Sequence, residues 1–71
     1  MEKRSITISG HRTSISIEDP FWQALAEIAR GRRMSIAALI ADIDRKRAAK
    51  GGLSSAIRLH VLAWYKSAQR P

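Results

Sequence analysis

The sequence predicts a mainly helical domain that begins with a short β-strand. Two observations carry this prediction. Between Thr13 and Glu18, apolar and small polar residues alternate with a period of two, which is the pattern of a strand with one buried face. From residue 20 onward, apolar residues recur at spacings of three and four, which is the pattern of amphipathic helices packed on a core. No other period-two run follows, so the strand needs a partner.

The strand, expected over residues 12–18, separates two sets of side chains. Ile15 and Ile17 share one face, and the opposite face carries Arg12, Ser14 and Ser16. The apolar face is predicted to be buried, and the polar face is predicted to point outward.

Residues 3–9 are also extended by pattern, and Gly10 interrupts them. Two arrangements fit residues 1–11. One is a hairpin that turns at His11-Arg12 and brings Ile8 opposite Ile15, and the other is a separate arm leading into the strand. Tight two-residue turns favour Asn-Gly or Asp-Gly, so the pair His-Arg favours the arm.

Two helices should follow the strand. The first is predicted over residues 20–30, with Asp19 as N-cap, Pro20 in the first helical position and Gly31 just past its end. The second is predicted over residues 35–49, with Ser35 as N-cap. Apolar residues at helical spacings mark the faces that should be buried: Trp22 and Leu25 in the first helix, and Ile36, Leu39, Ile40 and Ile43 in the second.

A third helix is predicted over residues 54–69, after the break at Gly51-Gly52 and with Ser54 or Ser55 as its cap. Its apolar line should cover part of the core or extend a dimer interface. Arg32 and Arg33 precede the cap Ser35 of the second helix. This segment is either a phosphate site at a helix N-terminus or an ordinary cap with exposed arginines. Asp42, Asp44 and the run Arg45-Lys46-Arg47 are expected on a solvated face, although the basic run could also lie near phosphate.

Length and composition narrow the classes of function. A single domain of 71 residues has a small core, and the absence of cysteine removes disulfides as a support, so dimerisation is the expected source of added stability. The formal charge of +7, or +14 for a dimer, attracts polyanions, with nucleic acid ahead of an anionic membrane. Two separated histidines and scattered acids supply neither a catalytic set nor a metal site, so we expect no enzyme and no cofactor. We expect a cytoplasmic protein.

The order of strand, helix, basic turn and helix resembles the ribbon-helix-helix DNA-binding domain, the class that includes the Arc and methionine repressors. The resemblance runs from Lys3-Arg4-Ser5-Ile6-Thr7-Ile8, through the strand and Phe21-Trp22, to Leu53-Ser54-Ser55-Ala56-Ile57-Arg58. Over roughly residues 3–65 the chain is similar to a short bacterial subfamily of this class.

The resemblance implies a fold and a set of site residues. Two chains would intertwine as a homodimer, their strands pairing antiparallel across a two-fold axis and inserting into the major groove of double-stranded DNA. It implies base contacts from Arg12, Ser14 and Ser16, and phosphate contacts from Ser35 and its neighbours. The implied phosphate-contacting residues are Ser35, Arg33, Arg32, Arg4 and Lys3. The implied dimer core consists of Ile15, Ile17, Trp22, Leu25, Ile36, Leu39, Ile40 and Ile43.

The implied function is transcriptional regulation, as a repressor that works at the nucleoid and can assemble beyond a dimer on DNA. An alternative within the same class is an antitoxin, which binds a toxin as well as DNA. We expect DNA as the main partner, because the third helix has a structured pattern rather than the polar segment that folds on a toxin. Membrane binding would leave the alternating strand without an explanation.

Overall fold

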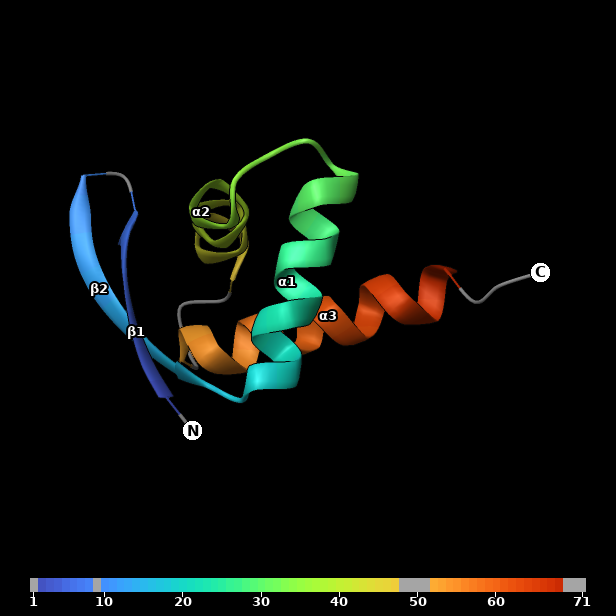
Figure 1. Cartoon of the computed structure of the whole chain (residues 1–71), viewed down its shortest axis with the longest axis horizontal. Coiled ribbons are helices and arrows are strands. Elements are labelled where there is room, and N and C mark those ends of the chain that lie inside the picture. The colour runs from blue at the N-terminus through green and yellow to red at the C-terminus, as the bar shows by residue number, and fades with distance from the viewer. Residues whose placement is uncertain (1, 9, 48–51, 69–71) are drawn as a thin grey trace.

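The structure, a computed structural model, describes residues 2–8, 10–47 and 52–68. The chain forms two strands and then three helices: β1 (Glu2–Ile8), β2 (His11–Ile17), α1 (Asp19–Gly31), α2 (Ile36–Lys46) and α3 (Leu53–Ala68). The strands form a hairpin on one side of the helices, with α2 packed against β1 and α3 against β2 (Figure 1). The C-terminal half of α3 extends away from the hairpin, past α1.

The N-terminal segment is a strand of the hairpin, so the expectation of a separate arm is wrong. β1 pairs antiparallel with β2, and Ile8 lies opposite His11 while Arg4 lies opposite Ile15. The turn therefore lies between Ile8 and His11, before the His11-Arg12 turn considered from the sequence. Gly10 has φ +81°, a left-handed conformation that glycine adopts without steric cost. This glycine supplies the turn chemistry that His-Arg lacks.

The helices begin and end close to the predicted residues, with differences at the caps. α1 begins at Asp19, and its N-cap is Glu18, whose carbonyl accepts hydrogen bonds from the amides of Phe21 and Trp22 at 3.0 and 3.1 Å. Asp19 is thus the first helical residue and not the cap. Ser35 caps α2 as predicted, since its hydroxyl accepts a hydrogen bond from the Ala38 amide at 3.0 Å.

The last residues predicted for two helices fall partly outside the described residues. α2 ends at Lys46, because Arg47 is already extended with φ −73° and ψ 152°, and residues 48–49 are not described. α3 begins at Leu53, so neither Ser54 nor Ser55 is its cap, and residue 69 is not described. The Ser54 hydroxyl donates to the Ser16 carbonyl of β2 at 2.9 Å instead.

The core lies between the hairpin and the three helices. Ile15 and Ile17 are 2% and 0% exposed, which confirms the predicted inward face of the strand. Ile8 of β1 and both Ile57 and Val61 of α3 are buried with them. The residues implied for a dimer core are therefore covered within one chain: Ile15, Ile17, Leu25, Leu39, Ile40 and Ile43 are buried, and Trp22 and Ile36 are half-buried.

The surface keeps a few large apolar side chains. Leu59, Leu62 and Trp64 of α3 are 66%, 55% and 39% exposed. Leu59 and Leu62 lie opposite the buried Ile57 and Val61 at helical spacing, so α3 is apolar on two faces. Within the described ranges, no helix is long and apolar enough to cross a membrane.

Candidate nucleic-acid interface

The outward face of the hairpin is polar and basic. Arg12 and Ser14 of β2 are exposed and Ser16 is half-buried, all opposite in parity to the buried Ile15 and Ile17. The structure therefore brings together the three residues expected to contact bases. Two adjacent strands with exposed side chains on one face form a ribbon that fits the major groove of B-DNA.

The first strand adds Ser5 and Thr7, which the sequence analysis did not assign to a site, and Lys3, for which it implied a phosphate contact. Lys3, Ser5 and Thr7 alternate with the inward Ile6 and Ile8, and all three are exposed. They lie beside β2 residues of the same face: Lys3 opposite Ser16, Ser5 opposite Ser14, and Thr7 opposite Arg12. Gly10 was the signal that could have located the turn and hence this pairing. We refer below to Lys3, Ser5, Thr7, Arg12, Ser14 and Ser16 as the ribbon face.

Arg4, expected to contact phosphate, is on the other side of the hairpin. Its guanidinium lies 4.5 Å from the centre of the Trp22 ring and 3.0 Å from the Asp19 carboxylate. Cation–π and ionic contacts of this kind attach a strand to the helix beneath it. Arg4 therefore joins β1 to α1 and is not grouped with the ribbon face, because alternate residues of a strand face opposite sides. Its contact with phosphate stays a prediction.

The sequence predicts that Gly31 lies just past the end of α1, but in the structure the left-handed turn residue comes two positions later. Gly31 is the last residue of α1, and the left-handed residue is Arg33, with φ 56°. The Arg33 amide donates to the Arg30 carbonyl at 3.1 Å, and the Met34 amide donates to the Ala29 carbonyl at 2.9 Å. This pair of bonds is the Schellman arrangement, in which glycine usually occupies the position that Arg33 holds here.

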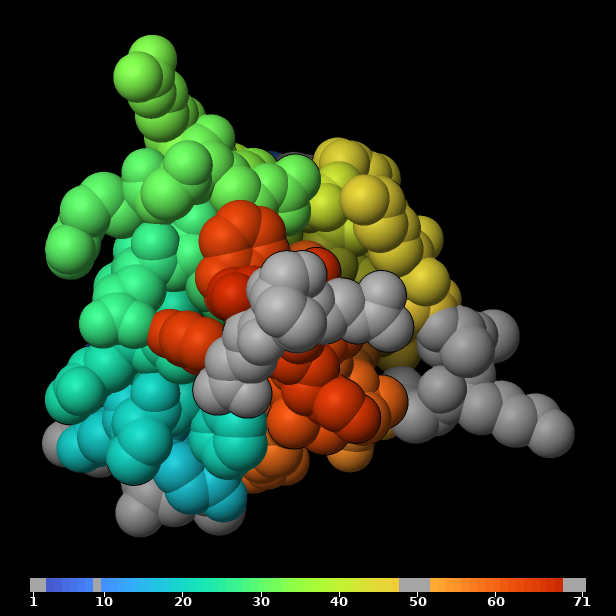
Figure 2. Space-filling model, turned by 90° about the vertical axis from the view of Figure 1, so that its right-hand side faces the viewer, coloured from blue at the N-terminus to red at the C-terminus, as the bar shows by residue number. Residues whose placement is uncertain are grey.

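Arg33 and Ser35 are both exposed at the start of α2. Long side chains of this turn project from the upper edge of the molecule (Figure 2). None of the described residues forms an ion pair with Arg33. A helix N-terminus carries unpaired amides and the positive end of the helix dipole, so an adjacent arginine adds to an existing preference for anions.

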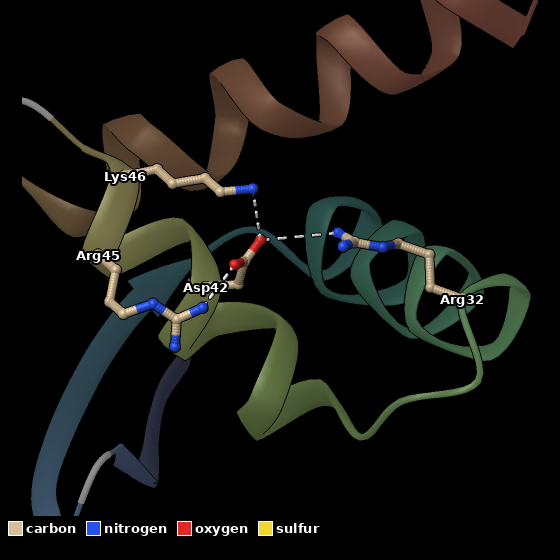
Figure 3. Close-up of polar contacts among 4 residues, drawn as sticks. All are labelled: Arg32, Asp42, Arg45 and Lys46. Atoms are coloured by element: carbon tan, nitrogen blue, oxygen red, sulfur yellow. Dashed lines mark hydrogen bonds and ion pairs between the residues drawn. The ribbon is translucent and has the colours of Figure 1, made fainter.

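Arg32 points elsewhere. Its guanidinium lies 3.8 Å from the Asp42 carboxylate, which also accepts from Arg45 at 2.7 Å and pairs with Lys46 at 3.2 Å (Figure 3). Asp42 is buried, although a solvated face was predicted for it. The face of α2 that carries Asp42 is covered by tertiary packing, which the pattern of one helix does not reveal. Arg32 is thus held by Asp42 and is not grouped with Arg33.

The pKa values of Asp42 and of the nearby His60 are shifted. The hydrogen bond from Lys46 lowers the pKa of the Asp42 carboxyl, and the nearby positive charges lower it further against the effect of burial. Burial lowers the pKa of the half-buried His60, and repulsion from Arg32 and Lys46 adds to this while Asp42 opposes it. Both shifts favour a folded chain in which Asp42 is ionised and His60 is neutral.

A further ion pair joins Glu18, directly after β2, to α3. The Glu18 carboxylate lies 2.8 Å from the Arg58 guanidinium, which also lies 5.8 Å from the centre of the Phe21 ring. The backbone hydrogen bond at Glu18, together with the bond from Arg58, lowers the pKa of this carboxyl. The negative charge nearest the end of the strand is therefore paired within the chain.

The described chain also has polar groups and a hollow away from the ribbon face. No group of three or more metal-ligating side chains occurs among the described residues. An open hollow of about 360 Å³ lies between α1 and α3, lined by Pro20, Phe21, Gln23, Ala24, Glu27, Val61 and Tyr65. Tyr65 donates to Glu27 across it at 2.5 Å, so these two polar side chains are paired within the chain.

Comparison with known families agrees with this geometry. A model of the ribbon-helix-helix domain matches residues 1–65, and the chain belongs to this family. Members are typically DNA-binding transcription regulators or antitoxins, and they usually bind DNA as dimers. Comparisons with curated proteins and with solved structures gave no match.

Proposed function

We propose that the chain binds double-stranded DNA in a sequence-specific manner and represses transcription in a bacterial cell by occupying promoter DNA. The observation that carries this proposal is the ribbon face, where two cations and four hydroxyls stand opposite an apolar core. The formal charge of +7 favours approach to DNA. The role is one of binding and not of catalysis.

The residues of this surface have distinct roles. Arg12 can donate two hydrogen bonds to O6 and N7 of a guanine, whereas Ser14 and Ser16 can donate to or accept from several bases. Lys3 lies at the end of the ribbon face, and its flexible ammonium can bind a phosphate of the DNA backbone. Arg33 and the α2 N-terminus capped by Ser35 supply a second phosphate contact, which sets the orientation of the protein on the duplex without reading sequence.

The proposal is tested by selecting binders from random duplex DNA at two salt concentrations. If a bound dimer contacts about six to eight phosphates, affinity should fall about a thousandfold or more between 50 and 200 mM salt. Recovery of a defined site supports specific binding, and recovery of no motif with the same salt dependence identifies a non-specific DNA-binding protein. Absence of binding at both concentrations contradicts the proposal and directs attention to a protein partner, as in an antitoxin.

Arg33 allows binding to be separated from stability. Replacing Arg33 by glycine should raise the free energy of unfolding by about 1 kcal/mol, because glycine adopts the left-handed conformation without strain. The same change should weaken binding to all sequences and reduce the salt dependence by about one counterion per chain. Denaturant unfolding and binding titrations over a range of salt measure the two effects.

Arg33→Ala is the matched control, since it removes the cation and keeps a side chain in the left-handed position. It should weaken binding as Arg33→Gly does, without the gain in stability. If Arg33→Gly were more stable and bound DNA with an unchanged salt dependence, the arginine would have no role at the phosphates.

We further propose that the DNA-binding form is a homodimer and that α3 provides its interface. Leu59 and Leu62 are the most exposed large apolar side chains among the described residues. Ser55 and Ala63 extend their face, and Lys66 is the charged residue at its end. In a chain with charge +7, an uncharged apolar face allows a second copy to approach with little repulsion. Figure 2 shows the C-terminal half of α3, in orange and red, between α1 and α2.

The double substitution Leu59→Glu and Leu62→Glu should convert the dimer to a monomer, because both carboxylates would face their copies across the interface. Sedimentation equilibrium over a range of protein concentrations measures the change. Ala68→Glu, an exposed position on the opposite side of the same helix, is the control and should leave the dimer intact. A double variant that stays dimeric would place the interface elsewhere.

A further inference from the structure

We propose that Arg58 of α3 is a positioning residue for DNA binding, which holds the Glu18 carboxylate toward α3 and offsets its negative charge at the end of the ribbon face. This inference rests on the proposed DNA binding. It extends that function to a helix that carries none of the residues assigned to DNA contact. Arg58 acts through Glu18 and is not itself a contact to DNA.

Glu18 continues the outward alternation of β2. Its backbone is extended, with φ −65° and ψ 146°, so its side chain has the same parity as those of Ser14 and Ser16. Two extended residues span about 7 Å, which places Glu18 directly past Ser16 along the ribbon face. The residue is exposed, and a carboxylate at this position would repel the phosphates of a bound duplex. The charge therefore needs a partner if this end of the ribbon face is to approach DNA.

The Arg58 guanidinium supplies that partner from a different part of the chain. Its Nε donates to the Oε1 atom of Glu18 at 2.9 Å, and its Nη2 lies 2.8 Å from the same oxygen. The nitrogens of a guanidinium are fixed in one plane, so two of them on one oxygen define the direction of the carboxylate more closely than a single flexible ammonium would. The contact therefore both offsets the charge of Glu18 and orients it.

Neighbouring contacts hold Arg58 and the start of α3 in place. The guanidinium lies 5.8 Å from the centre of the Phe21 ring, in the first turn of α1. One turn earlier in α3, the Ser54 hydroxyl donates to the Ser16 carbonyl at 2.9 Å. Residues four apart lie on one face of a helix, so Ser54 and Arg58 approach the end of β2 from the same side. The pair with Glu18 is thus already formed in the chain without DNA.

The charge of Glu18 persists at neutral pH. The backbone hydrogen bond at Glu18 lowers the pKa of this carboxyl, and the bond from Arg58 lowers it further. Protonation therefore does not remove the charge, and a neighbouring cation is needed to offset it. Because both side chains of the pair are partly exposed, the pair contributes little to the stability of the fold. Removing it should leave the chain folded.

The test compares the affinity of three chains for the selected DNA site at low salt: the natural chain, Arg58→Met, and the double variant Arg58→Met, Glu18→Gln. Methionine keeps an unbranched apolar stem beside Phe21 and removes the guanidinium. Arg58→Met should weaken binding by about two- to fivefold, the effect of one unpaired charge a few ångströms from a phosphate. The loss should shrink at higher salt because the repulsion is screened. The double variant should recover the affinity of the natural chain.

Arg58→Met combined with Glu27→Gln is the matched control, because it has the same net charge as the recovered double variant. Glu27 lies further along α1, about 13 Å from Glu18 by helix rise, which exceeds the Debye length of about 10 Å at 0.1 M salt. This control should therefore bind as weakly as Arg58→Met. Arg58→Lys keeps a cation near Glu18 and should keep most of the affinity. Circular dichroism checks that each variant is folded.

A measurement on the free protein tests the pairing without DNA. In Arg58→Met the pKa of the Glu18 carboxyl, followed by NMR titration, should rise toward its ordinary value, while the backbone hydrogen bond keeps it below that value. An unchanged pKa would mean that the guanidinium does not hold Glu18 in solution. That result would overturn the inference whether or not the chain binds DNA.

The binding results separate this inference from the proposed function. If the double variant stays as weak as Arg58→Met, Arg58 contacts DNA itself, so DNA binding stands and the positioning role is refuted. The role is also refuted if Arg58→Met binds as tightly as the natural chain, or if Glu27→Gln restores affinity as well as Glu18→Gln does. If the natural chain binds no DNA, the proposed function fails, and the role of Arg58 in DNA binding fails with it.

Discussion

Replacing Arg12 by alanine is expected to lower the affinity for the selected site by about 5- to 150-fold, which corresponds to the loss of one bidentate contact with guanine. Arg12 is exposed on the ribbon face, and no other described residue forms an ion pair with its side chain. The loss should be concentrated at one base pair, so the variant should also tolerate substitutions there that the natural chain rejects. Equilibrium titrations of the selected site and its single-base variants at fixed salt measure both effects.

Two further variants separate base reading from attraction by charge. Arg12→Lys keeps the positive charge and loses the planar fork, so it should retain the salt dependence and lose the base preference. Lys66→Ala removes one charge from the last turn of α3, at the far end of the molecule from the hairpin, and should change affinity only slightly (Figure 1). Equal losses from Arg12→Ala and Lys66→Ala would mean that Arg12 contributes charge alone.

The parts of the fold that follow from local patterns could be predicted from the sequence. The alternation around Ile15 and Ile17 defines which strand face is buried, and only one face can be apolar at a period of two. Ser35 was predicted as the cap of α2 because a hydroxyl before an amphipathic run has few other local partners, and it accepts from Ala38 as expected.

The hairpin was harder to predict because two weak indications conflicted. The alternation of residues 3–9 favours a strand, whereas His11-Arg12 opposes a turn at that position. Gly10 resolves the conflict at φ +81°, and the turn between Ile8 and His11 shifts the register so that Arg4, not Ile8, lies opposite Ile15. This shift puts Arg4 over Trp22 and puts Thr7 beside Arg12, whereas Ser5 and Thr7 share the outward face in either register.

Asp42 and Arg33 show the limit of patterns within one element. Asp42 is polar in a helix with other charges, and its burial depends on tertiary packing and on cations from two separate segments. Arg33 occupies a left-handed position that local preference assigns to glycine, and Gly31 lies only two residues earlier. In both cases the arrangement in space overrides the preference of the residue type.

The predicted dimer core illustrates the same limit at the level of subunits. Apolar spacing shows that residues such as Leu25 and Leu39 are buried, but it does not show which chain covers them. Here β1 and α3 of the same chain take part in that burial, through Ile8, Ile57 and Val61. The added strand and helix therefore give one chain a core of its own, and Leu59 and Leu62 of α3 stay outside that core.

Replacing Ile17 by serine is expected to have the largest effect on stability. Ile17 is fully buried at the end of β2, where the strand meets the helices. The substitution leaves a cavity and places a hydroxyl among apolar side chains, at a cost of about 3–5 kcal/mol. A domain of this size has a free energy of unfolding of only about 4–11 kcal/mol, so a large fraction of it would be lost. Thermal and urea unfolding followed by circular dichroism measure the change.

Thr7→Ser is the matched control for this prediction. It removes one methyl group from a β-branched residue on the exposed face of the same hairpin. It therefore measures the effect of β-propensity on stability without a change in the buried core. Its effect on stability should stay within about 0.5 kcal/mol. If Ile17→Ser were as stable as the natural chain, the two faces of β2 would be reversed, and Arg12, Ser14 and Ser16 would point into the core. DNA reading by this surface requires the opposite result, so the stability of one buried isoleucine tests the orientation on which the ribbon face depends.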